Sequence, residues 1–406
     1  MLSNETIQII KSTVPVLEVH GQTITKRFYQ LMFTNHPELL NVFNHTNQVQ
    51  GRQQTALANA VYAAAAHIDN LEAILPAVKQ IAHKHRALGI KPEGYAIVGK
   101  NLLAAIKDVL GDAATDEIIQ AWAEAYQVIA AAFIQVEADM YEKAEQQEGG
   151  WSDFRAFRVE KKVVESEVIT SFYLVPQDGK PIASYLPGQY VTVKLDIPGE
   201  PYTFNRHYSL SDAPGKPYYR ISVKREDTNK DLPAGKVSVY LHESVHEGDT
   251  LSLSAPAGDF TLDQEDQRPL VLISGGVGST PMMSMLQTTI ERNPNRAVTF
   301  IHAAIHPSLH AFKQEVDTLA EQHKQLSVYY CYEQPTDEVK LGTDYHKEGF
   351  IDKEWLQSIV PNTDAQFYMT GPMPFMKAVY RALQELNVPA EQIHYEFFGP
   401  AGSLAD

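Results

Sequence analysis

A glycine-rich segment in the last third of the chain could bind a nucleotide. It follows the apolar stretch 269–274 and precedes Met282, where a helix is expected to continue. Glycines let backbone N–H groups approach a pyrophosphate, and a helix N-terminus adds a favourable dipole. The segment is neither a P-loop nor the common Gly-x-Gly-x-x-Gly fingerprint, so a tight turn without a ligand is the alternative. The candidate binding residues are Gly276, Val277, Gly278, Ser279, Thr280 and Pro281.

A second group of residues could hold a phosphate and a planar ring. Arg206, His207, Tyr208 and Ser209 follow Tyr190 at about the distance of one strand and its turn. An arginine pairs with a phosphate in bidentate fashion, a tyrosine offers its face to a ring, and a serine can hydrogen-bond a ring nitrogen. The alternative is an ordinary strand that carries one solvated arginine.

Histidines in the first part of the chain could supply the axial ligand of a haem iron. Such a ligand is commonly a neutral imidazole whose other nitrogen is hydrogen-bonded. Most histidines are surface residues, so residue type alone does not choose among them. The candidates are His20, His36, His45, His67, His83 and His85.

Three stretches of different composition must position these residues. Residues 1–148 are alanine-rich and poor in glycine and proline, and residues 118–134 place apolar side chains at three- and four-residue steps, which predicts an all-α region. Short alternating segments then predict an antiparallel barrel or sandwich. After residue 263, apolar strands alternate with helical stretches, which predicts a parallel α/β sheet. The expected strands are 190–195, 220–224 and 251–253 in the barrel, and 269–274, 297–305, 326–333 and 366–370 in the sheet.

Composition excludes several classes of protein. The net charge of −16 argues against nucleic acid or an anionic membrane surface as the main partner. The single cysteine, Cys331, rules out an intramolecular disulfide and suits a reducing compartment. The sequence lacks an apolar run of roughly 18 residues, and Asn4 and Glu5 stand where a secretory signal would be basic. We expect a cytoplasmic protein that works as a monomer on small molecules, without nucleic acid or stable membrane insertion.

The order of motifs from residue 152 to the end resembles the ferredoxin-NADP reductase-like family. The resemblance implies that the residues around Arg206 bind FAD, that Gly235 and Ser238 lie near its pyrophosphate, and that the glycine-rich segment takes the nicotinamide cofactor. One departure is Thr370, which stands where this family often has a cysteine before Gly-Pro. The expected flavin residues are Tyr190, Arg206, His207, Tyr208, Ser209 and Ser238, with Phe397, Phe398, Gly399 and Pro400 near the flavin edge.

The first part of the chain resembles the globin domain of flavohaemoglobins. The segment 84–95 is similar to the proximal region of that family, which favours His85 as the axial ligand of a b-type haem. Residues 37–39 followed by Phe43 resemble the corner at which a phenylalanine packs on the porphyrin. Gln53 and Leu57, one helical turn apart, resemble the distal wall, and Tyr29 falls where the family has a distal tyrosine.

The resemblance implies a nitric oxide dioxygenase that oxidises NO with O2 to nitrate, using electrons from NAD(P)H that pass through FAD to haem. Tyr29 would be the distal hydrogen-bond donor, with Gln53 beside it. Tyr95 and Glu137 would form a hydrogen-bonded set with the axial histidine. Lys84 and Glu396 would tune the redox potentials of haem and flavin. Each of these residues also has a plain structural or surface alternative.

The expected domains are a globin domain at 1–147, an FAD-binding β-barrel at 151–262 and an NAD(P)H-binding α/β domain at 266–406. Two other functions stay open at this point. One is a haem-based sensor or carrier of O2 or NO, and the other is a haem-dependent reductase of other substrates. The sequence does not decide between NADH and NADPH.

Overall fold

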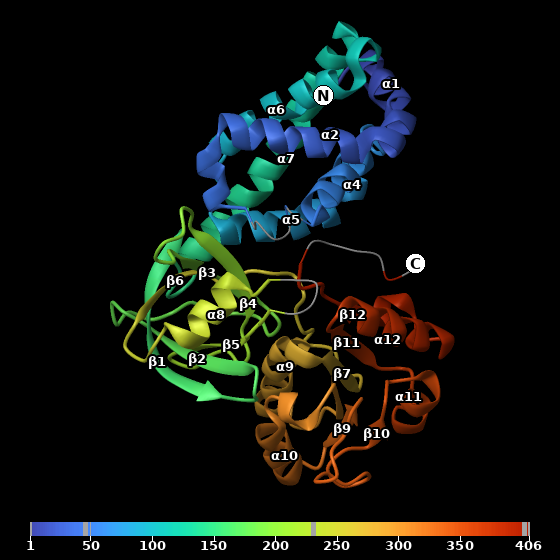
Figure 1. Ribbon diagram of the computed structural model, residues 1–406. Coiled ribbons are helices and arrows are strands. Elements are labelled where there is room, and N and C mark those ends of the chain that lie inside the picture. The colour runs from blue at the N-terminus through green and yellow to red at the C-terminus, as the bar shows by residue number, and fades with distance from the viewer. Residues whose placement is uncertain (1, 44–47, 49, 229–232, 400–403, 405–406) are drawn as a thin grey trace. The chain divides into compact units, whose positions relative to one another are not determined.

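The computed structural model describes residues 2–43, 48, 50–228, 233–399 and 404. The first part of the chain is helical, as its apolar spacing predicts (Figure 1). Helix α7 begins after Thr115, whose side chain accepts a hydrogen bond from the N–H of Ile118, and two acidic residues follow in its first turn. The helices are α1 (Asn4–Ser12), α2 (Val14–Asn35), α4 (Arg52–Ala66), α5 (Leu75–Leu88), α6 (Glu93–Leu110) and α7 (Asp116–Gln146), with a short 3-10 helix, η1 (Pro37–Asn41).

The helices share one apolar core. Ile24, Phe28 and Met32 from α2 pack in the same buried cluster as Leu102 from α6 and Trp122 from α7. The three- and four-residue spacing of these side chains puts them on one stripe of each helix. Burial of this stripe determines which face of each helix stays outside the core.

The middle of the chain forms the predicted antiparallel sheet, with strand order β4-β3-β6-β1-β2-β5. Strand β2 lies between β1 and β5, and Phe172 faces Lys162 on one side and Ile221 on the other. The register of β2 is regular against β5 but shifts against β1 between Val159 and Lys161. The strands are β1 (Phe154–Val164), β2 (Ile169–Pro176), β3 (Tyr190–Leu195), β4 (Phe204–Ser209), β5 (Tyr219–Lys224) and β6 (Thr250–Ser254), and helix α8 (Lys236–Glu243) precedes β6.

The last part forms the predicted parallel sheet, with strand order β10-β9-β8-β7-β11-β12. The four strands expected from the sequence are confirmed, and two short edge strands are added. The strands are β7 (Leu270–Gly275), β8 (Val298–Ala304), β9 (Leu326–Tyr332), β10 (Lys347–Glu348), β11 (Gln366–Thr370) and β12 (Ile393–Tyr395), and the helices are α9 (Ser279–Arg292), α10 (Lys313–Gln322), α11 (Lys353–Ile359) and α12 (Met373–Glu385).

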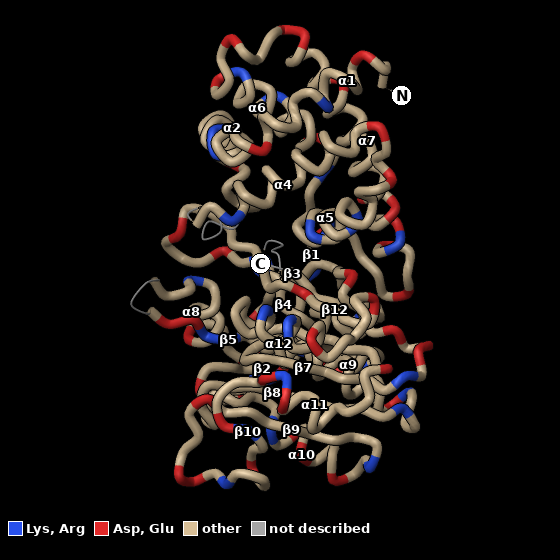
Figure 2. Tube along the Cα trace, turned by 90° about the vertical axis from the view of Figure 1, so that its right-hand side faces the viewer, with Lys and Arg blue, Asp and Glu red and all other residues tan. Residues whose placement is uncertain are grey.

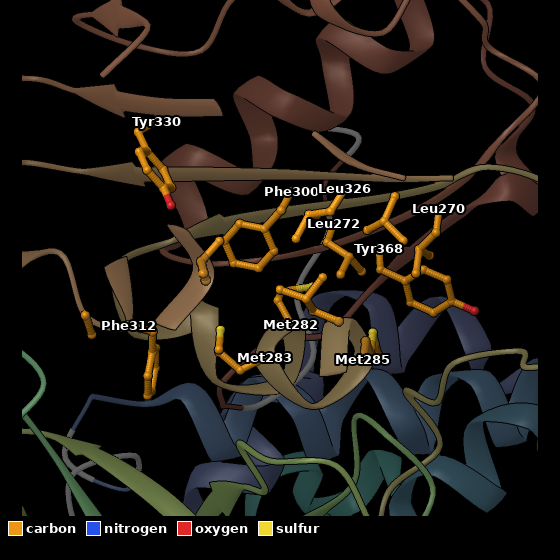
Figure 3. Close-up of a cluster of buried hydrophobic side chains, with 14 of the residues drawn as sticks. Leu270, Leu272, Met282, Met283, Met285, Phe300, Phe312, Leu326, Tyr330 and Tyr368 are labelled. Atoms are coloured by element: carbon orange, nitrogen blue, oxygen red, sulfur yellow. The ribbon is translucent and has the colours of Figure 1, made fainter. Parts of the chain in front are cut away.

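Each face of the parallel sheet has its own apolar core. On one face, Met282, Met283 and Met285 of α9 pack against Leu272 of β7 and Phe300 of β8 (Figure 3). On the other face, Ile273 and Phe367 lie in the same cluster as Met376 and Val379 of α12. Because α9 is anchored along its length, the turn that leads into it is held in one conformation.

By compactness the chain divides into two units. One comprises Met1–Arg155, Thr192–Arg206 and Leu253–Ala257, and the other comprises the remaining segments. Lys and Arg are interspersed with Asp and Glu along the described chain (Figure 2). Within the described residues, no helix is long and apolar enough to cross a membrane.

Candidate functional site

His85 lies in the last turn of α5 and is hydrogen-bonded to two residues from other helices. Its Nδ1 is 2.7 Å from Glu137 Oε1, on α7, and 3.1 Å from the hydroxyl of Tyr95, on α6. The Tyr95 hydroxyl in turn donates to Glu137 Oε1 at 2.5 Å. The three residues that the sequence assigned to one proximal set are therefore in direct contact.

These contacts define which ring nitrogen of His85 carries the proton. The buried carboxylate of Glu137 only accepts hydrogen bonds, and Nδ1 is the ring atom that faces it, so Nδ1 carries the hydrogen. The lone pair is then on Nε2, for which the described residues provide no hydrogen-bond partner, and a third of the His85 side chain is exposed. An imidazole with this tautomer and an open Nε2 is suited to bind haem iron.

Local packing holds the proximal set in place. Helix α5 ends at Gly89, whose φ of 76° is the left-handed conformation that glycine adopts most easily. The Tyr126 hydroxyl donates to the carbonyl of Tyr95 at 2.6 Å. A Cβ at Gly99 would lie 2.4 Å from the Tyr126 ring, so only glycine lets this ring approach α6. Burial raises the pKa of the Tyr95 phenol, and its hydrogen bond to Glu137 raises it further, so Tyr95 stays a donor.

The residues expected on the distal side also come together. Tyr29 is buried on α2, and its ring lies edge-on to Phe43 at 5.8 Å between centroids. The Tyr29 hydroxyl is hydrogen-bonded to the side chain of Gln48, whose Nε2 donates to Gln53 Oε1 at 2.8 Å. Burial raises the pKa of Tyr29 despite the hydrogen bond with Gln48, which keeps the phenol protonated. Leu57, on α4 like Gln53, packs against the helical core.

The candidate flavin residues cluster around strands β3 and β4. Tyr190 begins β3 and is buried, and its ring is 4.8 Å from that of His207. A Cβ at Gly258 would come within 3.0 Å of the Tyr190 ring, and the φ of Gly258 is 112°, so a glycine is needed there. Arg206 donates from Nη1 to the carbonyl of Asn205 at 2.8 Å. Tyr208 is partly buried, and Ser209 is buried at the end of β4.

Ser238 lies in the first turn of α8, next to Gly235. Its hydroxyl donates to the Gly235 carbonyl at 3.0 Å and accepts from the N–H of Glu226 at 3.2 Å. A Cβ at Gly235 would lie 2.7 Å from that hydroxyl. The N-terminus of α8 therefore has the compact, glycine-bearing geometry that suits a phosphate.

The glycine-rich segment connects β7 to α9, as the sequence predicts. Gly276 has a φ of 55°, and a Cβ at Gly278 would lie 2.3 Å from the Thr370 carbonyl at the end of β11. The turn therefore touches Thr370, the position at which the chain departs from the reductase-like pattern. Ser279 is buried, and its hydroxyl has no hydrogen-bond partner among the described residues. Val277 is partly buried, Thr280 donates to the Val277 carbonyl at 3.0 Å, and Pro281 lies inside the first turn of α9.

The C-terminal segment meets the same end of the parallel sheet. The Thr370 hydroxyl donates to the carbonyl of Glu396 at 3.2 Å. Phe397 packs on the apolar core beside β11, whereas about half of Phe398 is exposed. The N–H of Gly399 donates to the Phe397 carbonyl. Pro400, like His45, lies outside the described residues, and Lys84 is a partly buried residue of α5 next to His85.

One cavity of about 370 Å³ lies away from these residues. Arg220 and Glu315 form a 3.0 Å ion pair in its wall, and Tyr173, Tyr218 and Gln287 also line it. None of the predicted site residues is among those that line this cavity.

The chain matches three known families in the order in which these features occur. They are described as Globin, over residues 26–133, Oxidoreductase FAD-binding domain, over 156–262, and Oxidoreductase NAD-binding domain, over 272–381. His85 thus lies within the globin match, Ser238 within the FAD-binding match and the turn 276–281 within the NAD-binding match. Fold and site together define an NAD(P)H-dependent haem-flavin oxidoreductase.

Relatives over the full length narrow this class. The chain is 61% identical over 404 residues to a flavohemoprotein of Bacillus thuringiensis subsp. konkukian, with 100% of both chains covered. It is 55% identical over 405 residues to a flavohemoprotein of Bacillus subtilis, covering 100% of this chain and 99% of the relative. The chain belongs to the flavohemoprotein family.

Two solved structures agree with this assignment. The flavohemoglobin from Malassezia yamatoensis, determined with bound FAD and heme, has a TM-score of 0.83 at 26% identity and covers 98% of this chain and 100% of its own. The FAD/NAD-binding domain of the nitric oxide dioxygenase from Vibrio cholerae has a TM-score of 0.56 at 41% identity. The match covers 61% of this chain and 100% of that domain. The cofactor classes expected from the sequence, haem, FAD and a nicotinamide, are confirmed.

Sequence reasoning missed several residues of these sites. Gln48 joins the two distal residues, but it precedes α4 and has no periodic signal that would mark it. The apolar spacing over residues 118–134 includes Tyr126 but does not indicate that its hydroxyl donates to the Tyr95 carbonyl. Arg86 and Asn205 bond to segments far away in the sequence, and no local pattern indicates such contacts.

Proposed function

We propose that this protein is a nitric oxide dioxygenase that removes NO by oxidising it with O2 to nitrate, with electrons from NAD(P)H. The observation that carries the proposal is the contact of His85 with Glu137 and Tyr95 in a chain that also contains flavin and nicotinamide modules. Bound haem b supplies the iron at which O2 and NO react, and FAD converts the hydride of NAD(P)H into single electrons. The similar domain from Vibrio cholerae is part of a nitric oxide dioxygenase, which supports the same activity.

On the proximal side, Glu137 accepts the hydrogen of His85 Nδ1 and thereby makes Nε2 a stronger electron donor. Tyr95 donates to the same carboxylate oxygen and holds it in line with the imidazole. A strongly donating axial histidine favours activation of oxygen over its reversible storage. This distinguishes an oxygen-consuming enzyme from a carrier.

On the distal side, the protonated Tyr29 phenol is the donor that stabilises negative charge as it develops on oxygen. Gln48 hydrogen-bonds to the Tyr29 hydroxyl and to Gln53, so the three side chains restrain one another. Phe43 packs against Tyr29 at the edge of the oxygen site that these side chains border, and Leu57 narrows this site to the size of diatomic molecules.

For the reductase part, we propose that Arg206 pairs with an FAD phosphate and that Tyr190, His207, Tyr208 and Ser209 surround the flavin. Ser238 faces the pyrophosphate, and Phe397, Phe398, Gly399 and Pro400 border the flavin. The turn 276–281 takes the nicotinamide cofactor, with the buried Ser279 hydroxyl as a donor. Lys84 and Glu396 tune the potentials of haem and flavin by their charges.

We assign the domains to 1–147, 151–262 and 266–406, a division supported by the three family matches. One chain then supplies haem, flavin and nicotinamide sites, so we propose that it works as a monomer. We place it in the cytoplasm, where NAD(P)H is available.

The test is the ratio of NO consumed to NAD(P)H oxidised by purified protein in aerobic buffer. Conversion of NO and O2 to nitrate needs one electron for each NO, so a dioxygenase consumes two NO for each NAD(P)H. His85→Ala should abolish NO consumption, while FAD content and NAD(P)H oxidation by an artificial acceptor remain. A carrier or sensor would show no NAD(P)H-dependent NO loss, and a reductase of other substrates would show a different ratio.

A further inference from the structure

Arg86 directly follows His85 on α5, and its guanidinium is buried, with 6% of the residue exposed. The group donates from Nη1 to the Ala255 carbonyl at 3.3 Å and from Nη2 to the Pro256 carbonyl. Burying a guanidinium is costly unless its donors are satisfied, and its planar fork suits two adjacent acceptors. The residue next to the axial histidine therefore joins α5 to a segment about 170 residues later in the chain.

The two carbonyls directly follow a paired strand of the antiparallel sheet, β6. The hydroxyl of Ser254, the last residue of β6, accepts a hydrogen bond from the N–H of Thr192 on β3 at 2.9 Å and donates to the Ala255 carbonyl at 3.1 Å. Trp151 donates from its indole to the Leu253 carbonyl at 3.0 Å. All these residues lie in the same compact unit as α5. Because the Ser254 hydroxyl and the pairing of β6 with β3 hold this segment, Arg86 restrains the position of α5.

A second contact joins the helical part to the segment that carries Arg206. The N–H of Thr203 donates to Asn41 Oδ1, and Asn205 Nδ2 donates to the Asn41 carbonyl, both at 2.9 Å. The carbonyl of Asn205 in turn accepts from Arg206. This contact does not involve α5, so losing the Arg86 fork would leave the helical part attached but the proximal helix less restrained.

We propose that Arg86 is a positioning residue for electron transfer from flavin to haem. It holds the helix of the axial histidine on residues 255–256 and thereby keeps His85 and Arg206, the residue we assign to an FAD phosphate, on one compact unit. Electron transfer weakens steeply with distance, so a small displacement of α5 slows it. The inference rests on the electron path of the proposed function, but it does not depend on NO being the substrate.

The experiment compares holoprotein variants by anaerobic stopped flow after mixing with NADH. Arg86→Met removes the fork and keeps an apolar side chain of similar length, and Arg86→Lys restores the charge with one donor group. Arg158→Met, which removes an exposed arginine paired with Glu160, is the matched control. Flavin bleaching reports hydride transfer, and the shift of the haem Soret band reports electron transfer to haem.

We expect Arg86→Met to bleach its flavin at the wild-type rate but to reduce haem several-fold more slowly, because electron transfer weakens steeply with distance. Arg86→Lys should recover part of this loss, and Arg158→Met should show none. Reduction of haem by dithionite, and the spectrum of the CO complex, should match wild type in every variant. Haem reduction by NADH at the wild-type rate in Arg86→Met would overturn the proposal.

Two further outcomes are decisive. If Arg86→Met does not retain haem, the Lys variant provides the test, because a lysine that keeps haem but leaves NADH-driven haem reduction unchanged also overturns the proposal. If the variants reduce haem slowly and the wild type does not consume NO, the positioning role stands and the proposed function fails. The two results are therefore separable.

Discussion

The imidazole of His85 and the carboxylate of Glu137 are in contact through Nδ1 and Oε1 at 2.7 Å, and 3% of Glu137 is exposed. The two residues come from different helices, α5 and α7, and are 52 positions apart. Their contact fixes the tautomer of the imidazole. The electron-donating strength of His85 Nε2 therefore depends on Glu137, a residue far from His85 in the sequence.

The first prediction concerns this contact. Glu137→Gln keeps the shape and an acceptor oxygen for Nδ1 but removes the charge, so Nε2 becomes a weaker donor. NO turnover should fall about 10- to 100-fold, the range for partners of a metal ligand, and the haem reduction potential should rise. Glu124→Gln makes the same change on the same helix, at a residue that accepts a hydrogen bond from Thr6, and should change neither quantity. An unchanged potential in Glu137→Gln would show that the carboxylate does not act on the iron.

The second prediction concerns the distal donor. Tyr29→Phe removes the hydroxyl and keeps the ring packed against Phe43. Loss of one donor aimed at developing charge commonly costs about 2.7–4 kcal/mol, so NO turnover should fall roughly 10²- to 10³-fold. Oxygen should dissociate faster from the reduced protein, while NAD(P)H still reduces FAD at the normal rate. Stopped-flow measurements of these three steps check the prediction, and wild-type values for oxygen dissociation and NO turnover would reduce Tyr29 to a packing residue.

The third prediction concerns Arg206. Its replacement by Ala removes charge-assisted hydrogen bonds to phosphate, each typically about 1.5–3 kcal/mol, so FAD should be lost on dilution. Oxygen binding by chemically reduced haem should persist. Flavin fluorescence in the filtrate after gel filtration measures the loss. Full FAD occupancy would exclude Arg206 as a phosphate ligand.

The fourth prediction concerns pH. His302 is buried on β8, where its Nδ1 is 2.8 Å from the Ser274 hydroxyl, and burial lowers its pKa to about 4. The unfolded chain, with an ordinary histidine pKa near 6.5, binds this proton first as pH falls. The free energy of unfolding contributed by His302 is therefore full above pH 6.5 and declines between about 6.5 and 4, by roughly 3 kcal/mol at most.

Urea unfolding of wild type and His302→Asn, followed at pH 7.5 and pH 5, checks this prediction. The variant should be less stable at pH 7.5 but should lose less stability on acidification than wild type. The neighbouring His310 ring, stacked at 4.4 Å and also buried, is retained in both proteins. Its pKa is lowered mainly by its own burial and less by His302, so most of its contribution is common to both proteins. Equal losses in the two proteins would show that His302 is not the titrating group.

The sequence by itself determined the class of each region and the residues of each local motif. Helical and strand periodicities, the turn around Gly276 and the segment around His85 are short-range signals, because they depend on backbone conformation within a few residues. The strands predicted at 190–195 and 366–370 match β3 and β11 to the residue. The resemblance to a known family then indicated what these residues do, which the periodicity of the sequence does not show.

Only the tertiary structure decided which side chains from distant segments touch. The positions of Gln48 between Tyr29 and Gln53, of Tyr126 behind Tyr95 and of the Arg86 fork on residues 255–256 depend on how helices and strands pack. Packing satisfies buried polar groups with whichever partner the fold brings within about 3 Å, and that partner can be at any distance along the chain. Sequence spacing therefore indicates which residues form a local motif, but not which distant residues hold that motif in place.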